Sequence, residues 1–167
     1  MRNMKFRIFA PVAFLCMILA SSCNNTTVTS PDGKISFSIG LDNAGAPRYT
    51  VTCGNRKIIE NSALGFTLSG GENLADGFRI TGVRRASADT TWEQVWGESR
   101  FVRDNHNEMF VCLKNSCMEM DIRVRVFDDG LGFRYEFPGS GADKFEIMDE
   151  LTEFSFTEAH DAWWISR

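Results

Sequence analysis

The sequence predicts an all-β domain folded as an antiparallel β-sandwich. Many short segments alternate apolar with polar residues, a pattern that places apolar side chains on one face of a half-buried strand. Turns rich in Gly, Asn and Asp separate these segments. No long window carries the 3.6-residue period of an amphipathic helix. Short strands joined by such turns are typical of two antiparallel sheets packed face to face.

In the first half of the chain, the expected strands follow one another closely. The first alternates Ile and Phe with Ser, and turn residues follow it at Asn43–Pro47. Gly54-Asn55 then closes a hairpin between two further strands. The strands expected in this half are 35–41, 49–53, 56–60 and 64–68.

The second half contains the longest clean alternation, from Met118 to Val126. Its apolar residues are expected to face a core, and its charged residues are expected to form a solvated outer face. Asp128–Gly130 is a turn, after which residues 131–137 run back as the next strand. Shorter alternations predict further strands at 109–113, 145–147 and 154–156.

The composition excludes several classes of protein. The chain has 167 residues, of which 43% are hydrophobic and 24% are charged, so it is neither disordered nor fibrous. Its formal net charge is −4, and an acidic chain lacks the basic face that a nucleic acid requires. The length allows about one domain.

The N-terminus has the pattern of an export signal. Arg2, Lys5 and Arg7 precede the apolar run Ile8–Ala20, which is shorter than the ~20 residues of a membrane-spanning helix. Small residues and then Cys23 follow, which resembles a bacterial lipoprotein signal whose cysteine becomes the lipidated first residue. Plain secretory cleavage near residue 22 is the alternative. We therefore expect a signal peptide over 1–22 and a domain over 23–167, in the periplasm or at the outer membrane, attached to a membrane only through a lipid on Cys23.

The last apolar segment, Ala162–Ile165, looks like the opening of another buried strand, yet only two residues follow it. From this we expect a sandwich that is incomplete at its C-terminal end, with an exposed strand edge.

Two polar motifs contain the histidines of the chain. Asp104–Glu108 is rich in oxygen and nitrogen donors, but a polar run before a strand is more often a turn bonded to its own backbone than a cation site. His160-Asp161 offers a carboxylate-oriented imidazole without a serine or cysteine nucleophile placed beside it. We therefore expect structural roles for both motifs.

Acidic and aromatic residues are the side chains that sugar chemistry requires. Glu150 and Glu153 have an odd spacing, which in an extended strand turns the two carboxylates to opposite faces and makes them a poor catalytic pair. Tryptophans can stack on sugars, but in a small sandwich they are more often core residues, and this is what we expect of Trp92, Trp96, Trp163 and Trp164. The sequence thus predicts no catalytic residue and no metal site.

Three cysteines remain after the export signal: Cys53, Cys112 and Cys117. Cys112 and Cys117 flank an expected hairpin turn, on the outer face of its strands. In an oxidising compartment they could form a disulfide, although a loop this short gives little entropic stabilisation. A zinc site is less favoured, because one such cysteine pair supplies too few ligands.

A series of motifs runs through the chain in this order: Thr29–Lys34, Ala44–Pro47, Trp92–Glu98, Asn105–Glu108, Arg125–Pro138, Glu150–Phe154 and Ala162–Ile165. In order and spacing they resemble the N-terminal domain of glycoside hydrolase family 97. The resemblance covers nearly all of residues 29–165. It implies a β-sandwich of the galactose-mutarotase-like kind, packed on a catalytic (β/α)8 barrel in exported α-glucosidases and α-galactosidases.

The resemblance also implies where the chemistry of the family lies. The catalytic carboxylates belong to the barrel, and one glutamate of the N-terminal domain, downstream of the segment that matches Ala162–Ile165, binds the active-site calcium. This sequence ends before that position, so the calcium role is not carried over to Glu150 or Glu153.

The expected function is that of a non-catalytic N-terminal domain of an exported family-97 α-glycosidase, inactive alone and without a cofactor of its own. Its expected partner is the catalytic barrel, encoded separately if it is present, with carbohydrate as a further candidate ligand. The alternative is a free-standing envelope lipoprotein whose sandwich binds a glycan or a protein partner.

Overall fold

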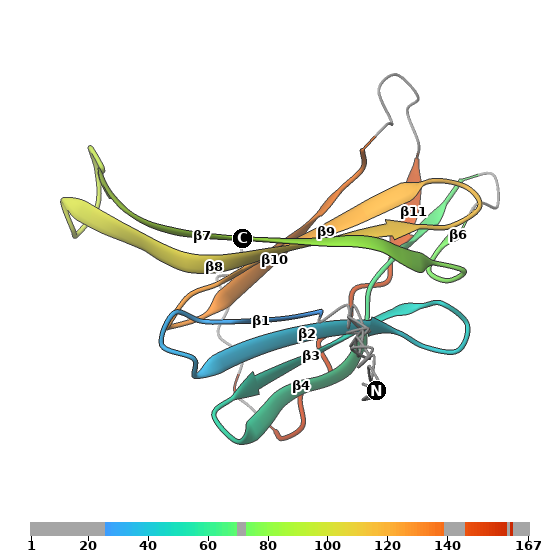
Figure 1. Ribbon diagram of the computed structural model, residues 1–167, viewed down its shortest axis with the longest axis horizontal. Helices are drawn as coiled ribbons and strands as arrows, with labels where there is room; N and C mark the ends of the chain where they lie inside the picture. Colours follow the sequence, from blue (N-terminus) through green and yellow to red (C-terminus); the bar gives the residue numbers. More distant parts are fainter. Residues whose placement is uncertain (1–25, 70–72, 139–145, 160, 162–167) are drawn as a thin grey trace, which may run out of the picture.

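The computed structural model describes residues 26–69, 73–138, 146–159 and 161, and these residues form an all-β domain. Figure 1 shows two layers of antiparallel strands facing each other, which confirms the predicted sandwich. Within the described ranges, no helix is long and apolar enough to cross a membrane. The export signal, Cys23 and the segment Ala162–Ile165 lie outside these ranges.

The strands form two four-stranded sheets and one small sheet. The first sheet has the order β1 (Thr27–Thr29), β2 (Ile35–Leu41), β3 (Pro47–Cys53) and β4 (Arg56–Ala63). The second sheet has the order β10 (Leu131–Glu136), β9 (Glu119–Val126), β8 (Phe101–Lys114) and β7 (Arg79–Glu93). The small sheet consists of β11 (Ile147–Glu150), β5 (Phe66–Leu68) and β6 (Asn73–Leu74).

The core lies between the two layers. The apolar residues that the alternation predicts to face inward are the ones that lie there. Met120, Ile122, Val124 and Val126 of β9 are fully buried, as are the inward residues of β8. Aromatic rings join the layers: Phe37 stacks on Tyr49 with ring centroids 5.4 Å apart, and Phe133 of the other sheet lies 5.5 Å from Tyr49. The apolar alternation therefore sets both the register and the core.

The strand β7 was not predicted, and β8 is longer than predicted. β7 pairs with β8 along its whole length, from Arg79 opposite Lys114 to Glu93 opposite Phe101. Most residues of β7 are exposed or half-buried because it is the outermost strand of its sheet, so it lacks an apolar alternation. β9 pairs with β8 only from Asn107 onward. The far part of the β7–β8 hairpin therefore continues as a two-stranded ribbon.

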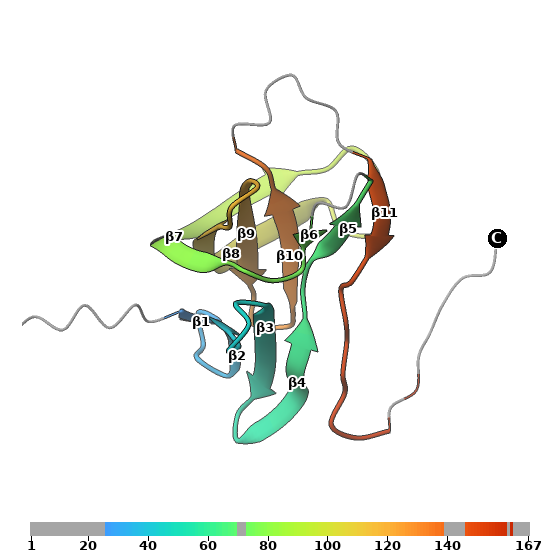
Figure 2. The same cartoon turned by 90° about the vertical axis from the view of Figure 1, so that its right-hand side faces the viewer.

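The chain after β11 closes one edge of the domain. Residues 151–157, which we call the strap, run beside β4 in the direction opposite to it (Figure 2). The amide of Glu153 donates to the carbonyl of Ala63 at 3.0 Å, and the amide of Thr157 donates to Ile58 at 3.1 Å. The Tyr49 hydroxyl donates to the Glu153 carbonyl at 2.7 Å, which ties the strap to the core.

Gly65 stands where the chain passes from β4 in the first sheet to β5 in the small sheet. Its φ is +148°, and a Cβ added there would lie 2.4 Å from the carbonyl oxygen of Leu74. Its own carbonyl accepts the amide of Leu151 at 2.9 Å. This crossing point therefore requires a residue without a side chain.

We predict that Gly65→Ala lowers the free energy of unfolding by about 3 kcal/mol, because the methyl group strains the backbone and collides with a carbonyl that is held in a sheet. Gly40→Ala is the matched control, since a Cβ there meets nothing within 4 Å. We expect the control to change stability by less than about 1 kcal/mol. Urea denaturation of both variants measures the difference, and equal effects would contradict the role of Gly65.

Candidate functional site

The outer face of the second sheet, which points away from the first sheet, carries polar residues aligned by the strand register. One row across the sheet consists of Arg84, Phe110, Arg123 and Arg134. The next row consists of Ala86, Glu108, Arg125 and Gly132. These residues face outward because their neighbours in sequence on β8 and β9, such as Met109 and Val124, face the core.

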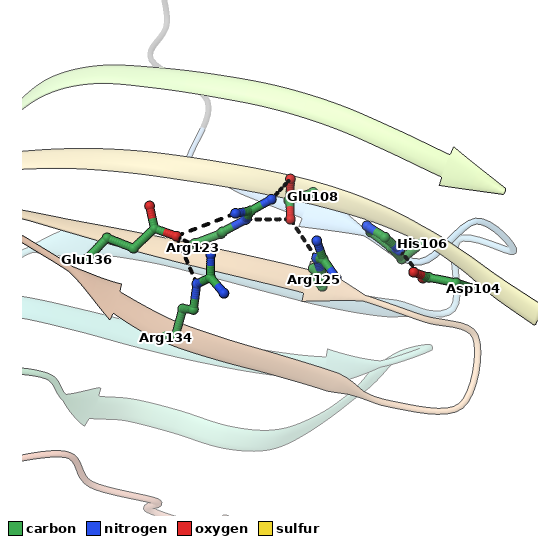
Figure 3. Close-up of polar contacts among 7 residues, drawn as sticks. All are labelled: Asp104, His106, Glu108, Arg123, Arg125, Arg134 and Glu136. Atoms are coloured by element: carbon green, nitrogen blue, oxygen red, sulfur yellow. Dashed lines mark hydrogen bonds and ion pairs between the residues drawn. The ribbon is translucent and has the colours of Figure 1, made fainter. Parts of the chain in front are cut away.

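Glu108 is the centre of this surface (Figure 3). Arg123 binds it in a two-pronged manner, with Nε 2.7 Å from Oε1 and Nη2 3.0 Å from Oε2. Nε of Arg125 donates to Oε1 at 2.6 Å. Arg123 also reaches Glu136, which accepts two hydrogen bonds from Arg134. We call these five residues the Glu108 cluster, and it joins β8, β9 and β10.

The electrostatics of the cluster keep its acid ionised. Arg123 has the largest effect and, together with Arg125, lowers the pKa of Glu108 to about 2 against the opposing effect of burial. Arg134 likewise lowers the pKa of Glu136. A carboxyl group with so low a pKa holds no proton to give at neutral pH, which argues against a role for Glu108 as a general acid. The ion pairs of the cluster link three strands of the sheet, and we call this link the ionic staple.

Phe110 lies between two arginines on the same face. The guanidinium carbon of Arg84 is 4.9 Å from the ring centroid, and that of Arg123 is 4.6 Å away. Such cation–π contacts orient the guanidinium groups. The stacking therefore holds Arg123 in place for its contact with Glu108.

The motif Asp104–Glu108 lies inside β8, so the prediction that it forms a turn is wrong. The pairing of these residues with β7, and of the last two also with β9, makes them a strand despite their polar composition. His106 is buried against the ring of Phe127, and its Nδ1 lies 2.5 Å from Oδ1 of Asp104 (Figure 3). Among the described residues, no group of three or more His, Cys, Asp or Glu side chains is placed to hold a metal ion.

Glu150 and Glu153 are held by different neighbours. Glu150 accepts the hydroxyl of Thr152 at 2.7 Å, and Thr152 lies 2.7 Å from the hydroxyl of Tyr135. Burial raises the pKa of Tyr135 to about 12. Oε2 of Glu153 accepts the amide of Ala63 at 2.9 Å. Both carboxylates are therefore engaged in contacts that hold the strap region, and His160 lies outside the described residues.

The predicted disulfide is not formed in the structure, where Cys112 and Cys117 are free thiols. The register of the β8–β9 hairpin places Cys112 opposite Asp121, with Sγ 3.5 Å from Oδ2, and burial raises the pKa of its thiol. Cys117 is exposed in the turn, where Asn115 fixes the backbone by accepting the amides of Cys117 and Met118.

Trp92 and Trp96 are not core residues, so that prediction is wrong for this pair. Their exposed fractions are 51% and 87%, and Val95 and Phe101 beside them are 94% and 59% exposed. We call these four residues the aromatic tip, because they lie at the free end of the β7–β8 ribbon, where β9 no longer pairs. The prediction fails because these residues lie beyond the part of the second sheet that covers the core. Trp163 and Trp164 lie outside the described residues.

Comparison with known proteins places these features in context. A family model described as glycosyl-hydrolase 97 N-terminal matches residues 28–167. A retaining α-galactosidase of Bacteroides thetaiotaomicron is 24% identical over 153 residues, which cover 92% of this chain and 22% of that protein. A probable retaining α-galactosidase of Streptomyces bingchenggensis is 31% identical over 143 residues, which cover 82% of this chain and 22% of that protein.

Solved structures give the same result. A glycoside hydrolase family 97 enzyme from Pseudoalteromonas sp. strain K8, in complex with panose, is 40% identical with a TM-score of 0.76, covering 84% of this chain and 22% of that chain. A β-arabinopyranosidase is 27% identical with a TM-score of 0.72, covering 79% of this chain and 21% of that chain. The chain thus spans about a fifth of the length of the relatives that it matches.

The Glu108 cluster leads to a prediction about pH. Because the folded pKa of Glu108 is about 2 and its ordinary value is 4.5, its contribution is fully present above about pH 4.5 and is lost as the pH falls toward 2. Glu108→Gln should lower the free energy of unfolding by about 2 kcal/mol at pH 7. The difference from the original chain should shrink below pH 4.5.

The matched control is Glu119→Gln, which removes the half-exposed ion pair with Lys114. We expect this control to cost less than about 0.5 kcal/mol. Chemical denaturation of the three proteins between pH 3 and 7 provides the measurement. A Glu108→Gln effect that equals the control, or that stays constant with pH, would contradict the staple.

Proposed function

The chain belongs to the glycosyl hydrolase 97 N-terminal family, and from this premise we propose that it is the non-catalytic supporting domain of an exported family-97 α-glycosidase. The observation that carries the proposal is the family match over residues 28–167, together with the fold that the chain shares with the Pseudoalteromonas enzyme. In this proposal the domain acts by packing against a catalytic barrel, and the barrel performs the hydrolysis.

The chemistry of the described residues supports a supporting role. Glu108 and Glu136 are ionised and bound to arginines, and Glu153 is bound to a backbone amide. Glycoside hydrolysis by the common two-carboxylate route needs one carboxyl group that holds a proton and another that attacks or activates water. The acids of the Glu108 cluster are poorly suited to either task, since both are held ionised by arginines that bind them.

The resemblance to family 97 implies an active-site calcium to which this domain gives one glutamate, downstream of the segment that matches Ala162–Ile165, and the described residues do not form a calcium site of their own. A calcium ion takes six to eight oxygen ligands, whereas these residues contain no candidate group of three or more ligating side chains. We therefore assign no step to calcium in this domain.

The packing surface is proposed to be the edge formed by β11 and the strap. It exposes four large apolar side chains with exposed fractions between 46% and 64%: Ile147, Met148, Phe154 and Phe156. β11 is also an edge strand, paired with β5 on one side. Apolar side chains that gather on one edge are typical of a surface that another domain covers. The basic and apolar N-terminal segment supports export of the whole protein.

The proposal is tested by transplanting the domain. Residues 28–167 are fused in place of the matching region of the Pseudoalteromonas enzyme, and panose hydrolysis is measured for the fusion, for that enzyme with the region deleted and for this chain alone. We expect the fusion to hydrolyse panose at least tenfold faster than the deletion, because the domain supports the barrel. This chain alone should show no turnover of panose or of nitrophenyl α-glucoside and α-galactoside. Turnover by this chain alone would contradict the proposal.

The packing edge has its own matched pair of variants in that fusion. Met148→Ser removes an exposed apolar side chain from the edge, and Val95→Ser removes another exposed apolar side chain from the distant aromatic tip. We expect Met148→Ser to lower the melting temperature of the fusion by several degrees more than Val95→Ser, because only the first lies in the proposed interface. Equal shifts would place the interface elsewhere.

The lipid anchor is tested through Cys23. In a Gram-negative host, we expect the full chain to fractionate with membranes and to incorporate labelled fatty acid. Cys23→Ala should move it to the soluble periplasmic fraction, since the thiol that takes the lipid is lost. Cys53→Ala removes a different exposed thiol and should leave the fractionation unchanged. A soluble original chain would indicate plain secretory cleavage instead.

A further inference from the structure

The Glu108 cluster carries more positive than negative charge. It contains three arginines and two glutamates, and both glutamates are held ionised, which leaves one positive charge in excess. The chain as a whole has a formal net charge of −4, so the cluster is a local positive area on an acidic protein. Such an area attracts an anion.

Two of the arginines have N–H groups left over (Figure 3). Arg125 donates to Glu108 through Nε alone, and Arg134 uses Nε and Nη2 on one oxygen of Glu136. A guanidinium group has five N–H donors in a fixed fork. Both Nη atoms of Arg125 and Nη1 of Arg134 therefore have no partner among the described residues. Arg123, by contrast, uses all three of its nitrogens on the two glutamates.

A hollow of about 210 Å³ lies on the same face of the second sheet. We call it the arginine hollow, and it is lined by Arg123, Arg125, Phe127, Gly132, Phe133 and Arg134.

The strand register explains why the hollow lies there. Gly132 of β10 pairs with Arg125 of β9, and Arg134 beside it pairs with Arg123. Where its neighbours on the outer face carry long side chains, Gly132 carries none, and a Cβ added to it would meet nothing within 4 Å. The hollow is thus the space that the missing side chain leaves among the arginines.

The chemistry and size of the hollow favour one small oxyanion group. Guanidinium N–H groups match the oxygens of a carboxylate or a phosphate in geometry and in charge. The same arginines disfavour a metal cation. A nucleic acid needs contacts to many phosphates, whereas a single charge is in excess here. Pockets for drug-sized ligands have volumes of about 300–1,000 Å³, so this smaller hollow suits a group rather than a large molecule.

We propose that the arginine hollow is a binding site for a small oxyanion, a carboxylate or a phosphate group, with Arg125 and Arg134 as its hydrogen-bond donors. Gly132 leaves the space that the anion fills. The site lies on the outer face of the second sheet, separate from the strap edge, and does not depend on the supporting role. Because both donors are partly exposed to water, we expect the affinity to fall as salt is added.

The test is an NMR titration of this chain, labelled with a nitrogen isotope, with sodium phosphate and with sodium glucuronate at neutral pH. The Nε–H signals of Arg125 and Arg134 and the amide signal of Gly132 are followed. Sodium chloride at the same ionic strength is the reference. We expect saturable shifts with at least one oxyanion at millimolar concentration, and no such shifts with chloride.

Two variants probe the site in different ways. Gly132→Leu fills the hollow and keeps every charge, and the strand accepts the side chain because Gly132 has no positive φ. Arg125→Gln removes the donors but also loosens the ionic staple, so Gly132→Leu is decisive if that variant fails to fold. Each should weaken the apparent affinity at least tenfold. Arg56→Gln, which removes an exposed arginine paired with Glu158, should leave binding unchanged. Circular dichroism confirms that each variant folds.

Each result decides the proposal. Shifts with glucuronate alone support it and assign the site to carboxylates, and shifts with phosphate alone support it and assign the site to phosphates. The proposal is overturned if neither oxyanion gives saturable shifts, if chloride gives the same shifts, or if Gly132→Leu binds as well as the original chain.

The fusion with the Pseudoalteromonas enzyme separates this site from the supporting role. If the original chain binds neither oxyanion but Gly132→Leu lowers the activity of the fusion, the arginines contact protein, and the proposal is overturned while the supporting role stands. Oxyanion binding by the chain together with an inactive fusion would support the site and remove that role.

Discussion

The rest of the structure depends on one constraint, the alternation of apolar and polar residues along β8 and β9. It makes the apolar side chains pack against the aromatic core. Burial of Met120 and Val124 between the sheets sets the parity of β9, and Met109 does the same for β8. A slip of one residue would turn these side chains to water and charged ones into the core. Because that slip is so costly, Glu108 and Arg123 meet on the outer face. The ionic staple thus follows from the hydrophobic pattern.

The parts of the fold predicted correctly from the sequence are those with an inward-facing apolar stripe, such as β2 and β9. The strand β7 escaped prediction because it is an edge strand whose conformation comes from pairing with β8 rather than from its own pattern. The predicted turn at Asp104–Glu108 is wrong for the same reason, since only pairing with β7 and β9 makes this polar segment extended. The exposure of Trp92 could not be predicted, because it depends on where β9 ends. Arg123 and Arg125 of the Glu108 cluster were predicted to lie on the outer face, but Glu108 was not, because it was expected in a turn.

These features fit the proposed role of a domain that acts by contact with its neighbours. Its charged residues mostly satisfy one another within the sheet, and its apolar residues are exposed at two separate places, the strap edge and the aromatic tip. A sheet whose outer face is locked by ion pairs can carry apolar side chains at its margins without losing its shape. The family relationship connects this surface pattern with a glycosidase.

The strap has a consequence for how the domain is made. Residues 147–157 pair with residues 58–68, so the backbone groups of this earlier segment find their partners only some ninety positions later in the chain. Such long-range pairing is slow to form. During synthesis on the ribosome, β4 would leave the exit tunnel with one side unsatisfied until the strap follows. A chaperone that shields that strand during synthesis would therefore protect the nascent chain at its most vulnerable stage.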